Sequence, residues 1–110
     1  MTKQEAIAKH REMWRWIAGI IEEKKCHVDI SSLKEIFCEG NHDYCIDNNC
    51  YLCEYVKDAG GCLKDCPLEW PGQRCVDRGN PIFFDALSEL DWKRQAALAR
   101  QIAELPEKEG

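Results

Sequence analysis

The sequence predicts a mainly α-helical fold, in which a long N-terminal helix and a C-terminal helix flank a cysteine-rich middle of loops and short helices. Apolar residues recur at helical spacing near both ends of the 110-residue chain, and no stretch shows the alternation of a half-buried strand. Five cysteines cluster between these ends. The length suits a single domain, 1–110, made of an N-terminal helix, 1–25, a cysteine-rich middle, 26–79, and a C-terminal helical segment, 80–105.

The first segment has both a helix start signal and a buried face. "TKQE" is a capping box, in which Thr2 accepts from first-turn amides and Glu5 reaches back. Trp16 lies off the apolar face, and we expect it to pack at the core or its rim, the alternative being an exposed contact with a partner. We expect His10 to be a satisfied core or boundary histidine. The residues expected on the buried face are Ala6, His10, Met13, Trp14, Ile17, Ile20 and Ile21.

Two further helical segments have recognisable boundaries. "SLKE", from Ser32, predicts the start of a short helix that Gly40 ends. Asn80 and Pro81 are suited to the N-cap and first position of the C-terminal segment, which Pro106 stops. "SELD", from Ser88, offers a cap for a fresh helix, so this segment is either one helix or two. The expected buried side of the short helix is Ile30, Leu33, Ile36 and Phe37.

The charge distribution disfavours a general binder of nucleic-acid backbones. The chain has 15 basic and 20 acidic residues and a net charge of −5, whereas phosphate binding needs clustered Lys and Arg. Residues 1–25 carry six bases and four acids, and residues 26–66 carry three bases and eight acids. We therefore expect protein partners and regard nucleic acid as a less suitable one.

No segment of the sequence directs the chain to a membrane. "MTKQEAIAKHREMW" is charged throughout and lacks the apolar core of a signal peptide. "WRWIAGII" is too short to span a bilayer. We expect a cytoplasmic protein without membrane association, and in a reducing compartment clustered cysteines favour metal binding or catalysis over disulfides.

The clustered cysteines have the spacing of a zinc site. "CYLC" places Cys50 and Cys53 two residues apart, and "CLKDC" adds Cys62 and Cys66 with one residue more. Cys75 is a fifth candidate. Four thiolates complete a tetrahedral Zn²⁺ site with no open position, so such a site is structural and supplies folding free energy. The sequence therefore predicts a zinc-stapled domain with four metal ligands drawn from Cys50, Cys53, Cys62, Cys66 and Cys75.

Two other uses of these cysteines are less suitable. A thioredoxin-like redox pair belongs beside a strand–helix unit, and no strand pattern precedes Cys50. Disulfides need an oxidising compartment, which nothing in the sequence indicates.

A second, looser set of candidate ligands either forms another metal site or consists of small buried thiols and surface histidines. That second set is Cys26, His27, Cys38, His42 and Cys45.

Four blocks of the chain resemble a group of small cysteine-rich proteins encoded by bacteriophages and prophages, mainly of Gram-positive bacteria. The blocks are "HREMWRWIA", "NNCYLCEY", "CPLEWPGQRC" and "ARQIAELPEKE". The resemblance implies zinc binding through the five clustered cysteines, with Trp14 and Trp16 matching the tryptophan motif of the group. The group usually has Cys-x-x-Cys-Pro where this chain has "CLKDCP", which makes Cys62 the ligand with least support.

These observations rank three functions. The first is a non-enzymatic protein that binds a host protein in the bacterial cell, for example an inhibitor of a defence system such as an anti-CRISPR protein. The second is a small zinc-containing regulator that binds nucleic acid through Lys9, Arg11, Arg15, Lys24 and Lys25. The third is a redox enzyme that uses Cys50 and Cys53, and no constellation of catalytic residues supports an enzyme. Trp14 and Trp16 suit a homodimer seam and an intrachain core equally.

Overall fold

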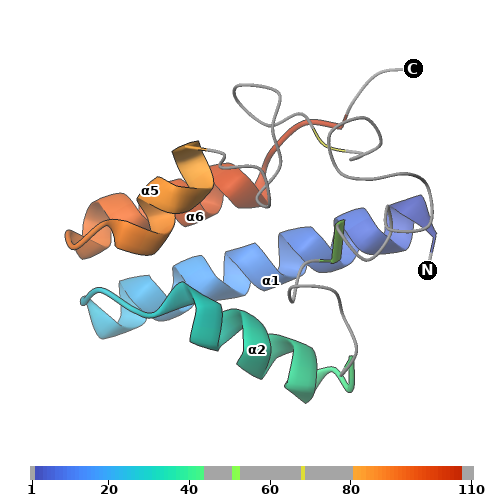
Figure 1. Ribbon diagram of the computed structural model, residues 1–110, viewed down its shortest axis with the longest axis horizontal. Helices are drawn as coiled ribbons and strands as arrows, with labels where there is room; N and C mark the ends of the chain where they lie inside the picture. The colour runs from blue at the N-terminus through green and yellow to red at the C-terminus, as the bar shows by residue number, and fades with distance from the viewer. Residues whose placement is uncertain (1, 44–50, 53–67, 69–80, 108–110) are drawn as a thin grey trace.

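Helices surround one apolar core. The computed structural model describes residues 2–43, 51–52, 68 and 81–107. Within these residues the chain forms four helices and no strand: α1 (Lys3–Lys24), α2 (Ile30–Gly40), α5 (Pro81–Ser88) and α6 (Trp92–Ala103). Helix α1 packs against α6 on one side and α2 on the other, and α5 contacts both α6 and α2 (Figure 1). The prediction of a mainly helical fold with a long N-terminal helix and a C-terminal helix is confirmed.

Helix α1 begins at the predicted N-cap, although Ile20, expected on its buried face, is only half-buried. Thr2 is the N-cap and its side chain accepts from the amide of Glu5, while Lys25 ends the helix in the left-handed conformation at φ 53°. With 22 residues the helix is about 33 Å long and crosses the whole core. Trp16 is half-buried and its ring centroid lies 5.7 Å from that of Phe37 on α2, so it packs at the rim of the core. The buried residues of α1 are Ala6, Ile7, His10, Met13, Trp14, Ile17, Ala18 and Ile21.

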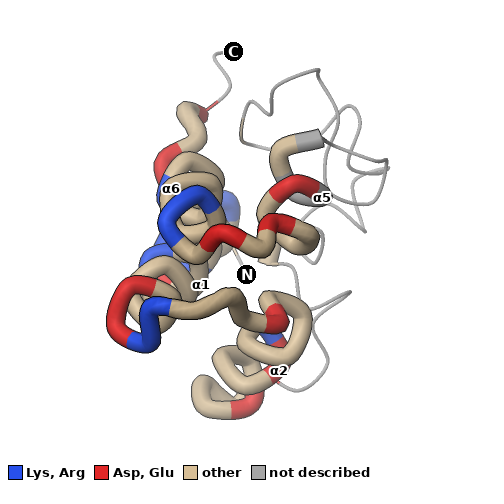
Figure 2. Tube along the Cα trace, turned by 90° about the vertical axis from the view of Figure 1, so that its left-hand side faces the viewer, with Lys and Arg blue, Asp and Glu red and all other residues tan. Residues whose placement is uncertain are grey.

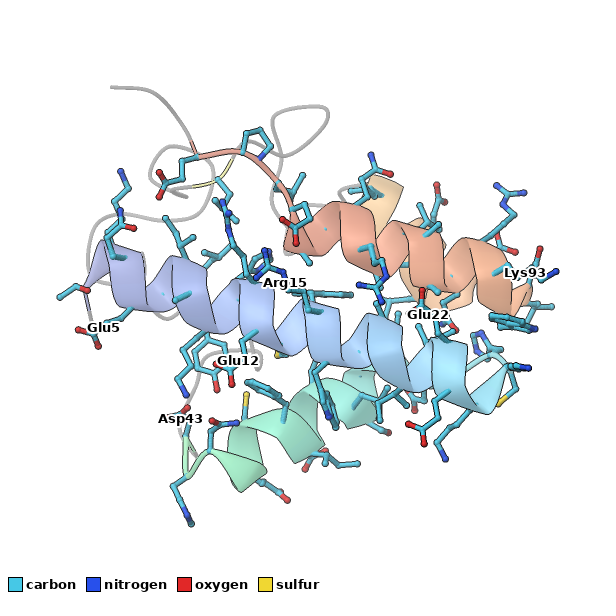
Figure 3. The ribbon with its side chains drawn as sticks, turned by 180° about the vertical axis from the view of Figure 1, so that it is seen from behind. Glu5, Glu12, Arg15, Glu22, Asp43 and Lys93 are labelled. Atoms are coloured by element: carbon cyan, nitrogen blue, oxygen red, sulfur yellow. The ribbon has the colours of Figure 1, made fainter. Side chains whose placement is uncertain are left out.

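Helices α1 and α6 form the largest interface and run antiparallel. Arg15 pairs with Glu104 at 2.6 Å, and Glu22 pairs with Arg100 farther along α1 (Figure 3). All four side chains are about half exposed, so these pairs set the register of the helices more than they stabilise them. The apolar contact of α6 comes mainly from small side chains, which let the two backbones approach closely. They are Ala96, Ala99 and Ala103, with Ile102.

Helix α2 differs from its prediction in two ways. Its N-cap is Asp29, whose side chain accepts from the amide of Ser32, so the helix begins before the predicted capping box. Ile36 was expected to be buried but is 53% exposed. The buried side of the helix contains Ile30, Lys34, Phe37 and Cys38, and Ile36 lies on the opposite side. Helix α2 ends at Gly40, as predicted.

The C-terminal segment is two helices. Helix α5 ends at Ser88, and Asp91 caps α6 by accepting from the amide of Lys93 at 3.1 Å. The "SELD" stretch therefore breaks the segment. Helix α6 ends at Ala103, before the helix-breaking Pro106. The predicted N-cap Asn80 lies outside the described residues.

Gln95 joins three segments at one end of the core. It is fully buried and its side-chain amide accepts from the backbone amide of Val28 and donates to the carbonyls of Val28 and Ala86, each at 3.0 Å. The loop after α1 and the end of α5 are thus attached to α6 through one side chain. His27 adds a second attachment, because its Nδ1 lies 2.6 Å from the carbonyl of Glu89.

Candidate metal centre

The five predicted zinc ligands lie outside the described residues. Cys50, Cys53, Cys62, Cys66 and Cys75 are therefore placed here only by their covalent neighbours. Among the residues that are described, no group of three or more His, Cys, Asp or Glu side chains is arranged to hold a metal ion. The zinc site remains a prediction from the spacing of the cysteines.

The first cysteine pair is tied to the helical core through the two residues between its members. Tyr51 is fully buried and Leu52 is 2% exposed. Adjacent Cα atoms are about 3.8 Å apart, so Cys50 and Cys53 each begin within one residue of a side chain held in the core. The ring of Tyr51 packs edge-on against Phe37, with centroids 6.2 Å apart. Sequence reasoning did not single out this anchor, although both intervening residues of "CYLC" are apolar or aromatic.

The hydroxyl group of Tyr51 fixes the loop that follows α2. It donates to Oδ2 of Asp43 at 2.8 Å. Loss of hydration on burial raises the pKa of Tyr51, and the neighbouring Asp43 and Cys38 raise it further. The phenol is therefore protonated at neutral pH and is a hydrogen-bond donor. The anchor thus joins the end of α2 to the beginning of the first cysteine pair.

Two more buried residues attach the cysteine-rich segment to the core. Leu68, two residues after Cys66, is fully buried and forms an isolated antiparallel bridge with Glu107. Ile82, at the start of α5, is 7% exposed and belongs to the same apolar core. Tyr51, Leu52 and Leu68 from the cysteine-rich segment, and Ile82 after it, therefore share one core with α1 and α6.

The second set of candidate ligands is divided between the two ends of α2. Cys26 and His27 precede α2 and are exposed, whereas Cys38 is buried in its last turn and His42 follows it. Within the described residues, no three or more of these side chains lie together as a group that could hold a metal ion. Cys45 lies outside the described residues, so the second site stays a prediction.

His10 is a structural histidine, as expected. It is 1% exposed, and its Nε2 lies 2.9 Å from the carbonyl of Ile102 on α6. A carbonyl only accepts, so Nε2 carries the proton and donates. Burial lowers the pKa of His10 to about 4, the hydrogen bond to Ile102 opposes this shift, and the positive charges of Arg11 and Lys34 add to it. A neutral imidazole is therefore held between α1 and α6.

Three of the five bases proposed to bind nucleic acid are engaged within the chain. Arg15 pairs with Glu104, Arg11 donates to the carbonyl of Leu105 at 3.1 Å, and Lys9 donates to Asn41 at 2.9 Å. Lys24 and Lys25 are exposed at the end of α1. Phosphate contacts at this surface would have to compete with these internal partners.

Comparison with known proteins identifies no relative. No protein-family model, curated protein or solved structure matches the chain. None of the described helices is long and apolar enough to cross a bilayer.

Proposed function

We propose that this chain is a non-enzymatic, zinc-stapled protein that acts in the bacterial cytoplasm by binding a host protein. The resemblance of its four sequence blocks supports a phage-type protein, and inhibition of a bacterial defence system, such as anti-CRISPR activity, is one activity that suits this proposal. The observation that carries the proposal is the cysteine pair Cys50 and Cys53, which has zinc spacing and encloses two residues buried in the helical core. A metal held there would stabilise the surface that the helices present.

The charge of the chain supports a protein partner over nucleic acid. The net charge is −5, and three of the five candidate bases on α1 and its C-cap make internal contacts. An acidic protein associates faster with a basic surface on its partner, because complementary fields steer the encounter. A regulator that binds nucleic acid is the second candidate, and it requires affinity that falls steeply with salt.

Native mass spectrometry of the full chain, expressed without chelator, tests the zinc part of the proposal. We expect one zinc per chain, lost under denaturing conditions. A metal-free protein whose mass is lowered by missing hydrogens would show disulfides instead, and the proposed staple would be wrong.

The binding part of the proposal is tested by capture from a host lysate. We expect a partner that saturates with increasing bait, and the absence of any saturable partner would contradict it.

A further inference from the structure

The outer face of α2 presents an isoleucine where a solvated helix normally has a polar residue. Ile36 is 53% exposed and points away from the side of the helix that contains Phe37 and Cys38. In a helix, residues three and four positions away are its surface neighbours. We call this surface the α2 outer face, made of Ser32, Leu33, Glu35, Ile36, Glu39 and Gly40.

This face is open to close approach. Leu33 is half-buried and extends the apolar contact of Ile36. A Cβ atom built on Gly40 would meet no other atom within 4 Å. Gly40 and the exposed Ser32 have small side chains beside Ile36, so another surface can approach Ile36 closely. A single exposed apolar residue needs no explanation, but one that is flanked by a second apolar residue and by small residues is suited to packing.

The exposed charges that α2 itself carries have one sign. Among the described residues, the exposed charges of α2 and its caps are all acidic, because Lys34 is only 6% exposed. Helix α5 and the turn after it also carry acids and no base. The exposed bases of the described residues lie on α1, on its C-cap Lys25 and on α6 (Figure 2). Several of them pair with acids, namely Arg15, Arg94 and Arg100. The exposed surfaces of α2 and α5 are therefore acidic, and Lys9 of α1 is a base at their edge, where it donates to the C-cap residue Asn41.

We propose that the α2 outer face docks a protein surface that carries arginine or lysine side chains around an apolar centre. This inference rests on the proposed function, that the chain acts by binding a protein. Ile36 and Leu33 enter the apolar centre, and the carboxylates of Glu35 and Glu39 pair with the surrounding guanidinium or ammonium groups. The acidic surroundings speed the encounter and exclude acidic partners.

The probe is a short, fluorescently labelled helical peptide that carries arginines around a central leucine on one face. Its binding to the full chain is followed by fluorescence anisotropy at low and moderate salt. We expect Ile36→Ser to raise Kd about fivefold, through lost apolar contact, and Glu39→Lys to raise it about tenfold. The matched controls are Leu90→Ser, at a residue 80% exposed, and Glu23→Lys, which makes the same charge change near the end of α1. We expect both controls to change Kd less than twofold.

Two results would overturn the docking surface. The first is an equal loss of affinity in Glu39→Lys and Glu23→Lys, which would show attraction by net charge alone. The second is concentration-dependent self-association in analytical ultracentrifugation that Ile36→Ser abolishes, which would make a second copy of the chain the occupant. A saturable lysate partner that both α2 variants still capture would also reject this face while leaving the proposed function intact. Failure of the wild-type chain to capture any partner would instead count against the proposed function.

Discussion

At the scale of single residues, Gln95 has the largest predicted effect on stability. Replacing it by leucine removes the partners of the Val28 amide and of the Val28 and Ala86 carbonyls. Because buried backbone groups without partners are costly, we expect Gln95→Leu to lower the free energy of unfolding by roughly 2–4 kcal/mol. Urea denaturation followed by circular dichroism measures this loss. Gln101→Leu is the control, since Gln101 is exposed on the same helix, and an equal loss in both variants would contradict the role of Gln95.

His10 makes the stability of the protein depend on pH. Its pKa is about 4 in the folded chain and close to its usual 6.5 in the unfolded chain, so the unfolded state binds more protons between these values. The stabilising contribution of the neutral imidazole is complete above pH 6.5 and is lost as pH falls toward 4. The loss is about 3 kcal/mol, from 1.36 kcal/mol per pKa unit. We expect the unfolding free energy of His10→Gln, measured by urea denaturation at each pH, to vary less over this range. Parallel pH profiles of stability for the variant and the wild type would contradict the role of His10.

At the scale of elements, the alanines of α6 set its distance from α1. Ala99 is fully buried, so Ala99→Leu inserts a large side chain into a closely packed interface. We expect a loss of about 1–3 kcal/mol in thermal or urea unfolding. Ala97→Leu is the matched control, because Ala97 is exposed on α6 and leucine has nearly the helix propensity of alanine. Equal unfolding free energies in the two variants would contradict close packing between α1 and α6.

At the scale of the whole molecule, zinc binding should be linked to the stability of the helical core. Tyr51 and Leu52 are core residues that lie between two predicted ligands. If zinc binds only the folded chain, the unfolding free energy of the protein rises by about 1.4 kcal/mol for each tenfold increase in free zinc above the Kd for zinc. We expect Cys50→Ser to weaken the dependence of stability on zinc. We expect Cys26→Ser to leave it unchanged, since Cys26 is exposed in the loop before α2 and is not one of the five clustered cysteines. Wild-type stability that is indifferent to zinc would contradict the linkage.

The sequence by itself determined the helices whose signals are local. The cap at Thr2 and the end of α2 at Gly40 each depend on residues within a few positions, so spacing and cap chemistry were sufficient. The "SELD" stretch left one helix or two open, and the structure has the break after Ser88. The spacing of the five cysteines likewise predicts a metal site, although that site stays a prediction. The predicted start of α2 at the Ser32 capping box was wrong, because Asp29, three residues earlier, caps the helix instead. Ser and Asp are both good N-cap residues, so residue type alone did not separate the two positions.

Only the tertiary structure decided which side of each helix is buried and which distant residues meet. In α2, Ile36 is exposed and Lys34 is buried, which reverses what hydrophobicity predicts. The helix packs on the core through the side that carries Lys34 and Phe37. The hydrogen bond from Tyr51 to Asp43 and the three bonds of Gln95 follow from how the helices pack. Burial is a property of the assembled core, since the free energy gained by one face depends on which neighbours cover it.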